Sequence, residues 1–319
     1  DTFEAVPVLF WSSVVLVGIG IASDLFTLKP STKLIAIVGV ASLFLFFDYR
    51  LYWTESQTID SVMTLFWIVG ITSAFNLLDN MDGLCGGIAL IAGAAFLATV
   101  LPVTVESPLF LQAQQLAILL GAIAGFLVYN VHPASVAMGE AGSLLIGLSM
   151  AAMPLRFAPG RGSDLLAIIA VPALLLLIPI ADAALVAIVR IVSGPDTETR
   201  HGSSSQRLVA IGLSERSAVG LLWLLAAAGG GIAVLAERSQ QGLTPIVVAM
   251  FIIGMALLAI YLARVRVHED IDPDRLRGTI MPLGVESVFF KKVILLINQT
   301  YFFSCLEKNF SNLYKINKL

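Results

Sequence analysis

The chain has 319 residues, of which 58% are hydrophobic and 13% are charged, and its mean hydropathy is +0.91. Because soluble domains are roughly half apolar and about a quarter charged, this composition excludes a soluble globular protein and predicts an integral membrane protein. The net charge of −3 comes without an extended basic face, which argues against nucleic-acid binding.

Apolar runs of roughly 17–25 residues, the length that crosses a bilayer, recur along the chain. They are too long for barrel strands and lack strict alternation, so we predict an all-α, polytopic membrane protein with about nine to ten transmembrane helices. A weaker stretch near 286–305, interrupted by Lys291 and Lys292, is predicted to be an interfacial helix or a tenth span. The nine predicted spans cover about 6–23, 33–49, 60–78, 84–103, 109–129, 143–158, 165–192, 217–236 and 245–264.

The composition changes near residue 286, where Ala, Gly and Leu give way to Phe, Asn, Lys, Ile and Tyr. We therefore predict a transmembrane domain over 1–285 and a separate tail over 286–319. No signal peptide is expected, since the sequence opens Asp1-Thr-Phe-Glu4 without a basic segment.

Polar loops follow the first, third, fifth and seventh predicted spans, so all of them are expected on one side of the membrane. Most Lys and Arg near the span ends lie on this side, including Arg190, Arg207 and Arg216, whereas few, such as Arg50 and Arg238, lie on the other. The positive-inside rule then predicts a cytoplasmic location for the polar loops.

Asp79 and Asp82 lie three residues apart where the third predicted span ends, and Gly83 permits a sharp turn after them. Ionisable groups at the edge of a membrane span favour a functional site. Two close carboxylates repel each other unless a cation lies between them, and hard oxygen ligands suit Mg²⁺. The alternative is a capping cluster in a solvated loop.

The loop after the fifth predicted span begins at Asn130 and ends Gly139-Glu140-Ala-Gly142-Ser143. An acid between two glycines at a helix start favours a metal ligand, with backbone N–H groups free to bind a phosphate. A helix cap made by Glu140 and Ser143 is an equally good interpretation.

Two further acids are ambiguous when they are considered alone. Asp24 ends the first predicted span, where it either caps the next helix or serves a site. Asp182 lies deep in a long span and is either a polar contact between helices or a site residue.

The longest polar loop contains Arg200-His201-Gly-Ser-Ser-Ser-Gln206-Arg207. Its composition favours a flexible linker, although Arg207 could bind a phosphate through its forked guanidinium. The loop histidines His132 and His268 are predicted to be solvated.

Taken together, these segments resemble a known family. An Asp near the first loop is followed by Asn76-Leu-Leu-Asp79-Asn-Met-Asp82-Gly and then by Asn130-Val-His-Pro-Ala with Met138-Gly-Glu140-Ala-Gly-Ser. This order is similar to the polyprenyl-phosphate N-acetylhexosamine-1-phosphate transferases, which are related to the phospho-MurNAc-pentapeptide translocase. The resemblance runs from about residue 8 to about residue 280 and suggests that the first family helix is missing from this sequence.

The resemblance implies a reaction in which a polyprenyl (undecaprenyl) phosphate attacks a UDP-N-acetylhexosamine and UMP leaves. It implies Mg²⁺, with Mn²⁺ as an alternative ion, and an active face on the cytoplasmic side of the bacterial inner membrane; a homodimer is left open. By position it assigns catalytic roles to Asp24, Asp79 and Asp82, metal binding to Glu140, Asp79 and Asp82, and substrate binding to Asn76, Asn130 and Arg207.

The sequence also departs from the family pattern. Ser23 replaces one Asp of an Asp-Asp pair, Ser73 replaces an Asn, Glu140 replaces an Asp, and the histidine cluster of relatives reads Ser203-Ser-Ser-Gln206. A non-catalytic relative that binds a lipid phosphate or a partner is therefore the main alternative, and a transporter is a more distant one.

Overall fold

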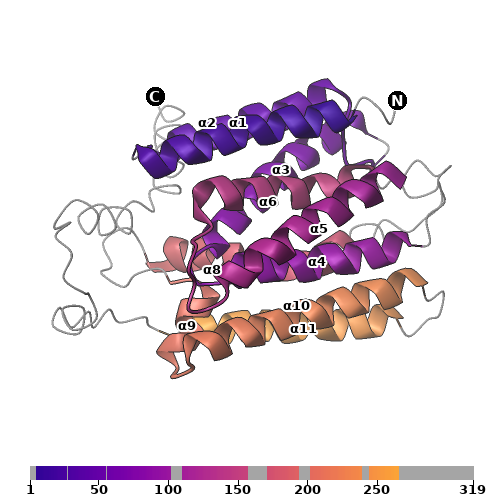
Figure 1. Ribbon diagram of the computed structural model, residues 1–319. Helices are drawn as coiled ribbons and strands as arrows, with labels where there is room; N and C mark the ends of the chain where they lie inside the picture. The colour runs from indigo at the N-terminus through magenta and orange to yellow at the C-terminus, as the bar shows by residue number, and fades with distance from the viewer. Residues whose placement is uncertain are drawn as a thin grey trace, which may run out of the picture.

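Helices make up all the regular structure in the described part of the chain (Figure 1). The computed structural model describes residues 5–26, 28–54, 56–101, 110–156, 171–193, 202–238 and 244–265. The helices are α1 (Ala5–Leu25), α2 (Pro30–Phe46), α3 (Gln57–Leu78), α4 (Leu84–Val100), α5 (Phe110–Asn130), α6 (Gly139–Ala152), the 3₁₀ turn η1 (Met153–Arg156), α8 (Leu177–Ser193), α9 (Ser204–Ala210), α10 (Glu215–Arg238) and α11 (Thr244–Ala263).

The all-helical membrane fold predicted from the sequence is confirmed. Among the described residues, five helices are long and apolar enough to cross a membrane, and three shorter apolar helices accompany them. The total of nine to ten spans stays a prediction. The division at residue 286 and the helix near 286–305 lie outside the described residues.

The first helices form a layer at one edge of the bundle, drawn in indigo in Figure 1. Helix α1 packs on α6, and α2 packs on α3. Gly20 makes the first contact close, because a Cβ at this position would lie 2.3 Å from Cα of Ala141. This approach brings Asp24, one turn further along α1, to the start of α6.

The opposite edge of the bundle consists of α10 and α11 (Figure 1). Helix α10 packs against α4, and α3 packs against both α6 and α8, so that α3, α4 and α6 lie in the centre. Fully buried side chains such as Phe75, Ile88 and Leu78 form the larger of the two apolar cores. The short helix α9 packs on α10, α11 and α8, in the segment for which we had expected a linker.

The polar loops meet at one end of the bundle, as the alternation of spans predicts. Side chains or backbone groups of 24–33, 79–83, 130–140 and 202–215 contact one another there, as described below. The membrane side of this end stays a prediction.

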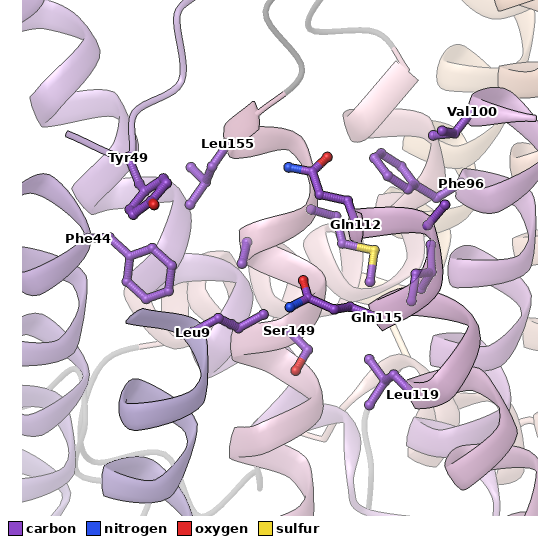
Figure 2. A pocket seen from close by; sticks show the side chains of 14 residues that line it. Leu9, Phe44, Tyr49, Phe96, Val100, Gln112, Gln115, Leu119, Ser149 and Leu155 are labelled. Atoms are coloured by element: carbon purple, nitrogen blue, oxygen red, sulfur yellow. The ribbon is translucent and has the colours of Figure 1, made fainter. Parts of the chain in front are cut away.

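An apolar cavity of about 120 Å³ lies toward the other end (Figure 2). It is lined by residues late in α2, α4 and α6 and early in α1 and α5, roughly 20 Å along α6 from Glu140. Gln112, Gln115 and Ser149 are among its few polar side chains, and no acid lines it. The cavity is therefore remote from the residues that could bind a phosphate.

Candidate active site

Asp24 caps the N-terminus of α6. Its Oδ1 accepts a hydrogen bond from Glu140 N at 3.1 Å, and its Oδ2 accepts one from Ala141 N at 3.5 Å. Gly139 has φ +70°, and a Cβ there would lie 2.9 Å from Asp24 Oδ2, so glycine is required by both conformation and space. A cap made by Glu140 and Ser143, one of the two interpretations left open, is not formed, and Asp24 accepts from the N–H groups that the other interpretation left free for a phosphate.

Glu140 lies beside the positive charge of Lys33 at the start of α2. Glu140 Oε1 forms an ion pair with Lys33 Nζ, with both side chains less than one-fifth exposed. The second oxygen, Glu140 Oε2, is buried and has no hydrogen-bond partner among the described residues. A buried carboxylate oxygen without a partner is costly, so this atom is suited to a ligand.

Asp79 follows the last residue of α3 and faces other acids. Burial, then the charge of Asp24, then that of Asp82, raise the pKa of Asp79 from 3.8 to about 6. The chain therefore brings three carboxylates near one another across the ends of α1 and α3. Such repulsion favours a bound cation or a protonated carboxyl.

Asp82 lies in the turn between α3 and α4, which Gly83 closes with φ +73°. Its Oδ2 accepts a hydrogen bond from Ala134 N at 3.0 Å and lies 3.2 Å from His132 Nδ1. Glu215 Oε2 lies 3.4 Å from the same nitrogen. His132 was predicted to be solvated; its ring is about one-third exposed, and it also lies between two acids.

Three asparagines fix the loops around these acids. Asn130 accepts from Gly83 N at 3.1 Å and donates to Val136 O at 2.9 Å, so it joins the end of α5 to the turn beside Asp82. Asn76 accepts from Ser143 Oγ at 2.9 Å. Asn80 accepts from Ser205 Oγ at 2.8 Å. Substrate binding by Asn76 and Asn130 stays a prediction, and here both amides hold the backbone or a neighbouring helix.

The serine segment that replaces the family's histidines is helical. Ser203 and Gln206 form a capping box, each side chain accepting from the other's backbone N–H, and Ser204 and Ser205 are buried. The flexible-linker interpretation is therefore wrong for 203–210; Arg200, His201 and His268 lie outside the described residues. The capping box, Ser-x-x-Gln, was the signal in the sequence that predicts this helix.

Arg207 is buried beneath α9 rather than turned toward the acids. Nε donates to Gly202 O at 2.8 Å, and Nη1 donates to Leu262 O at 2.9 Å and Val265 O at 2.6 Å. Two of these carbonyls lie in the last turn of α11 and just after it, where a helix has carbonyls without an intrahelical partner. Phosphate binding by Arg207 stays a prediction, whereas its contacts in the structure tie α9 to α11.

Asp182 forms the polar contact between helices that was one of its two interpretations. Its Oδ1 accepts hydrogen bonds from Ser204 N at 2.6 Å and Ser204 Oγ at 2.5 Å. Only 1% of Asp182 is exposed. The residue therefore joins α8 to the start of α9.

The predicted metal ligands were Asp79, Asp82 and Glu140. In the part of the chain that the structure describes, no group of three or more His, Cys, Asp or Glu side chains lies close enough to hold a metal ion. The donor chemistry nevertheless fits a hard cation, because Glu140 Oε2 is unpartnered and Asp79 is repelled by neighbouring carboxylates. Metal ligation stays a prediction that requires these side chains to come closer together.

The fold and this end of the bundle define a polytopic membrane protein with a carboxylate-rich site between its helix ends. Comparison with known proteins gives a family likeness. Residues 6–158, just under half of the chain, match the family described as glycosyl transferase family 4, so this segment is similar to that family. The family resemblance derived from the motifs is confirmed.

Individual relatives are similar over different lengths. A Bacillus subtilis protein named probable undecaprenyl-phosphate N-acetylglucosaminyl 1-phosphate transferase is 29% identical over 77% of this chain and 70% of its own length. The decaprenyl-phosphate N-acetylglucosaminephosphotransferase of Mycobacterium leprae is 29% identical over 82% of this chain and 72% of its own. The phospho-N-acetylmuramoyl-pentapeptide-transferase of Limosilactobacillus reuteri is 41% identical, but the match spans only 32% of either chain.

Proposed function

We propose that this chain transfers an N-acetylhexosamine 1-phosphate, with N-acetylglucosamine as the first candidate sugar, from a UDP-sugar to a polyprenyl phosphate. The relatives that are similar over most of the chain carry names for this chemistry. The observation that carries the proposal is that Asp24, Asp79, Asp82 and Glu140 meet at one end of the bundle from three separate segments, the end of α1, the turn after α3 and the start of α6.

In the proposed reaction, an oxygen of the lipid phosphate attacks the β-phosphorus of the UDP-sugar. The bond from that phosphorus to the oxygen bridging it to the α-phosphate breaks, and UMP leaves with the electron pair. The product is a sugar linked to the lipid through a diphosphate, the first step of a cell-envelope glycan. Because both substrates are anionic, the catalyst must offset negative charge and align the two phosphates.

The residues divide this work between them. Asp24, through its bonds to Glu140 N and Ala141 N, fixes the start of α6 against α1. Lys33, paired with Glu140, supplies a positive charge beside this acid. Asp79 and Asp82 place two carboxylates at the turn that Asn130 holds.

The acids would hold a divalent cation, Mg²⁺ or Mn²⁺, through Asp79, Asp82 and Glu140. When bound, such an ion neutralises charge on the diphosphate and orients it. The positive-inside pattern supports an active face on the cytoplasmic side of the bacterial inner membrane.

The test is release of UMP by purified protein in detergent or nanodiscs, with UDP-GlcNAc, undecaprenyl phosphate and Mg²⁺. We expect UMP release that requires both substrates and stops when the ion is chelated. UDP-GalNAc and UDP-glucose as alternative donors define sugar specificity. Folded protein that releases no UMP from any of these donors would contradict the proposal.

A non-catalytic role is the second candidate, and one observation favours it. Ser205, in the segment where relatives carry histidines, is fully buried and bonded to Asn80 instead of facing a substrate. This role predicts binding of UDP-GlcNAc or undecaprenyl phosphate by calorimetry without turnover, whereas turnover by the unmodified chain excludes it.

A further inference from the structure

We propose that His132 is a positioning residue that holds Asp82 in its working orientation and links it to the start of α10. This inference rests on the proposed function, since Asp82 is one of its acids. It concerns a histidine from the loop between α5 and α6, a part of the chain separate from the segment in which relatives carry their histidine cluster.

The ring nitrogen that faces the acids must carry a hydrogen. His132 Nδ1 lies 3.2 Å from Asp82 Oδ2 and 3.4 Å from Glu215 Oε2, and ionised carboxylates only accept hydrogen bonds. A hydrogen on Nδ1 therefore bonds Asp82 Oδ2, whereas a bare Nδ1 would face two acceptors without a donor. This fixes one end of the imidazole as the donor to Asp82.

The contact between His132 and Asp82 is one of two hydrogen bonds that hold a single oxygen of Asp82 and, in the described part of the chain, leave its other oxygen without such a bond. Oδ2 receives hydrogen bonds from His132 Nδ1 and Ala134 N, two residues of the same loop. Within the described residues, Oδ1 has no such bond, so it stays available for a substrate or an ion. Two donors on one oxygen restrict rotation of the carboxylate, which is how surrounding groups orient a ligand.

Glu215 extends the link to another element. It lies in the first turn of α10, the helix that packs on α4, and its carboxylate reaches the same nitrogen. The histidine therefore couples the turn before α4 with the helix that packs against α4. Movement of the loop relative to α10 would shift Asp82.

The exposure of these three side chains indicates that His132 orients Asp82 and contributes little to the stability of the fold. The side chains of His132, Asp82 and Glu215 are 34%, 40% and 55% exposed, and exposed ion pairs contribute little to folding. Loss of the ring should thus leave the melting temperature unchanged and affect turnover. Loss of a group that orients a ligand typically lowers activity or metal affinity by about 10–100-fold.

The test compares three substitutions of His132 that distinguish the role of Nδ1 from that of Nε2. His132→Asn keeps a donor near the position of Nδ1, His132→Gln keeps a polar group near Nε2, and His132→Ala keeps neither. We expect Ala and Gln to lower kcat about 10–100-fold with little change in KM for the lipid, and Asn to restore most of it. Ser135→Ala is the matched control, because it removes a bond in the same loop to Tyr129 O and none to Asp82.

A second readout does not depend on turnover. Calorimetric titration with Mg²⁺ alone should give weaker binding for His132→Ala and His132→Gln than for the wild type and His132→Asn. If the wild type binds Mg²⁺ in this pattern but releases no UMP, the proposed function fails and the positioning role stands. Wild-type values of both kcat and Mg²⁺ affinity in His132→Ala, or a loss in His132→Asn equal to that in His132→Ala, would overturn the inference.

Discussion

Two polar clusters lie in this bundle, and they are built in opposite ways. Around Asp79, burial, and after it the nearby carboxylates of Asp24 and Asp82, raise the pKa of Asp79 to about 6. Around α9, most of the buried groups satisfy each other: Asp182 Oδ1 accepts from Ser204, and Arg207 donates to backbone carbonyls, while Asp182 Oδ2 is buried without a partner among the described residues.

The difference between the clusters indicates what each one is for. Polar groups that satisfy each other stabilise a fold, whereas like charges held together weaken it and persist where a ligand uses them. We therefore expect substitutions in the Asp79 cluster to lower activity without lowering stability. Substitutions in the α9 cluster should lower stability first.

The largest expected effect is on turnover in the Asp79 cluster. Asp82→Asn keeps an acceptor for Ala134 N but removes the charge, so we expect UMP release to fall by roughly 100-fold or more with an unchanged melting curve. Initial rates at saturating UDP-sugar measure the effect. Activity near that of the wild type would show that the Asp82 charge has no part in catalysis.

The next effect is on stability in the α9 cluster. Arg207→Leu removes the Arg207 hydrogen bonds to the carbonyls of Gly202, Leu262 and Val265 and the cation near Asp182. We expect the free energy of unfolding in detergent to be about 3 kcal/mol lower than that of the wild type. Arg216→Leu is the exposed control and should change stability by less than about 0.5 kcal/mol. Normal stability with lost substrate binding in Arg207→Leu would instead support a direct role for Arg207 at the phosphate.

A smaller effect, of opposite sign, is expected at Asp79. Its pKa in the folded protein, about 6, exceeds the usual 3.8, so the folded state binds more protons than the unfolded state between these values. Stability therefore falls as the pH rises through that window. Without divalent ions, Asp79→Asn should raise the free energy of unfolding by about 1–2 kcal/mol above pH 6, after allowance for solvent screening, and by nothing below pH 3.8.

Thermal melts of Asp79→Asn and the wild type across this pH range measure the difference. Added Mg²⁺ should narrow it, because a cation between the carboxylates stabilises only the wild type. A destabilised variant at pH 8 in chelator would show that Asp79 is held by favourable contacts instead of being repelled.

The sequence predicts some parts of this site and not others, for physical reasons. Long apolar runs in the sequence predict the helical spans. The polar loops follow every second span, which predicts that they lie at the same end of the bundle. Whether a side chain faces solvent or a partner depends on contacts between segments far apart in the chain. The contact between His132 and Asp82, which lies 50 residues away, could therefore not be predicted.

The α9 segment shows the limit of composition as a guide. Three serines beside a glycine resemble a linker, yet Ser203 and Gln206 form a capping box, and Asp182 and Asn80 supply partners for the next two serines. The guanidinium group of Arg207 suggested a phosphate ligand. Its burial beneath α9 depends on the position of α11, which the sequence does not give.

The smallest expected effect concerns Glu140, where the family pattern has Asp. Glu140→Asp withdraws the carboxylate from Lys33 by about one methylene and restores the usual reach from α6, so we expect UMP release equal to or above that of the wild type. The matched comparison is Lys33→Met, which removes the ion pair but keeps the longer glutamate side chain at position 140. This variant should be less active than Glu140→Asp. If Glu140→Asp instead loses more activity than Lys33→Met, the longer side chain is an adaptation to its partner, and the acid at position 140 works here only as a pair with Lys33.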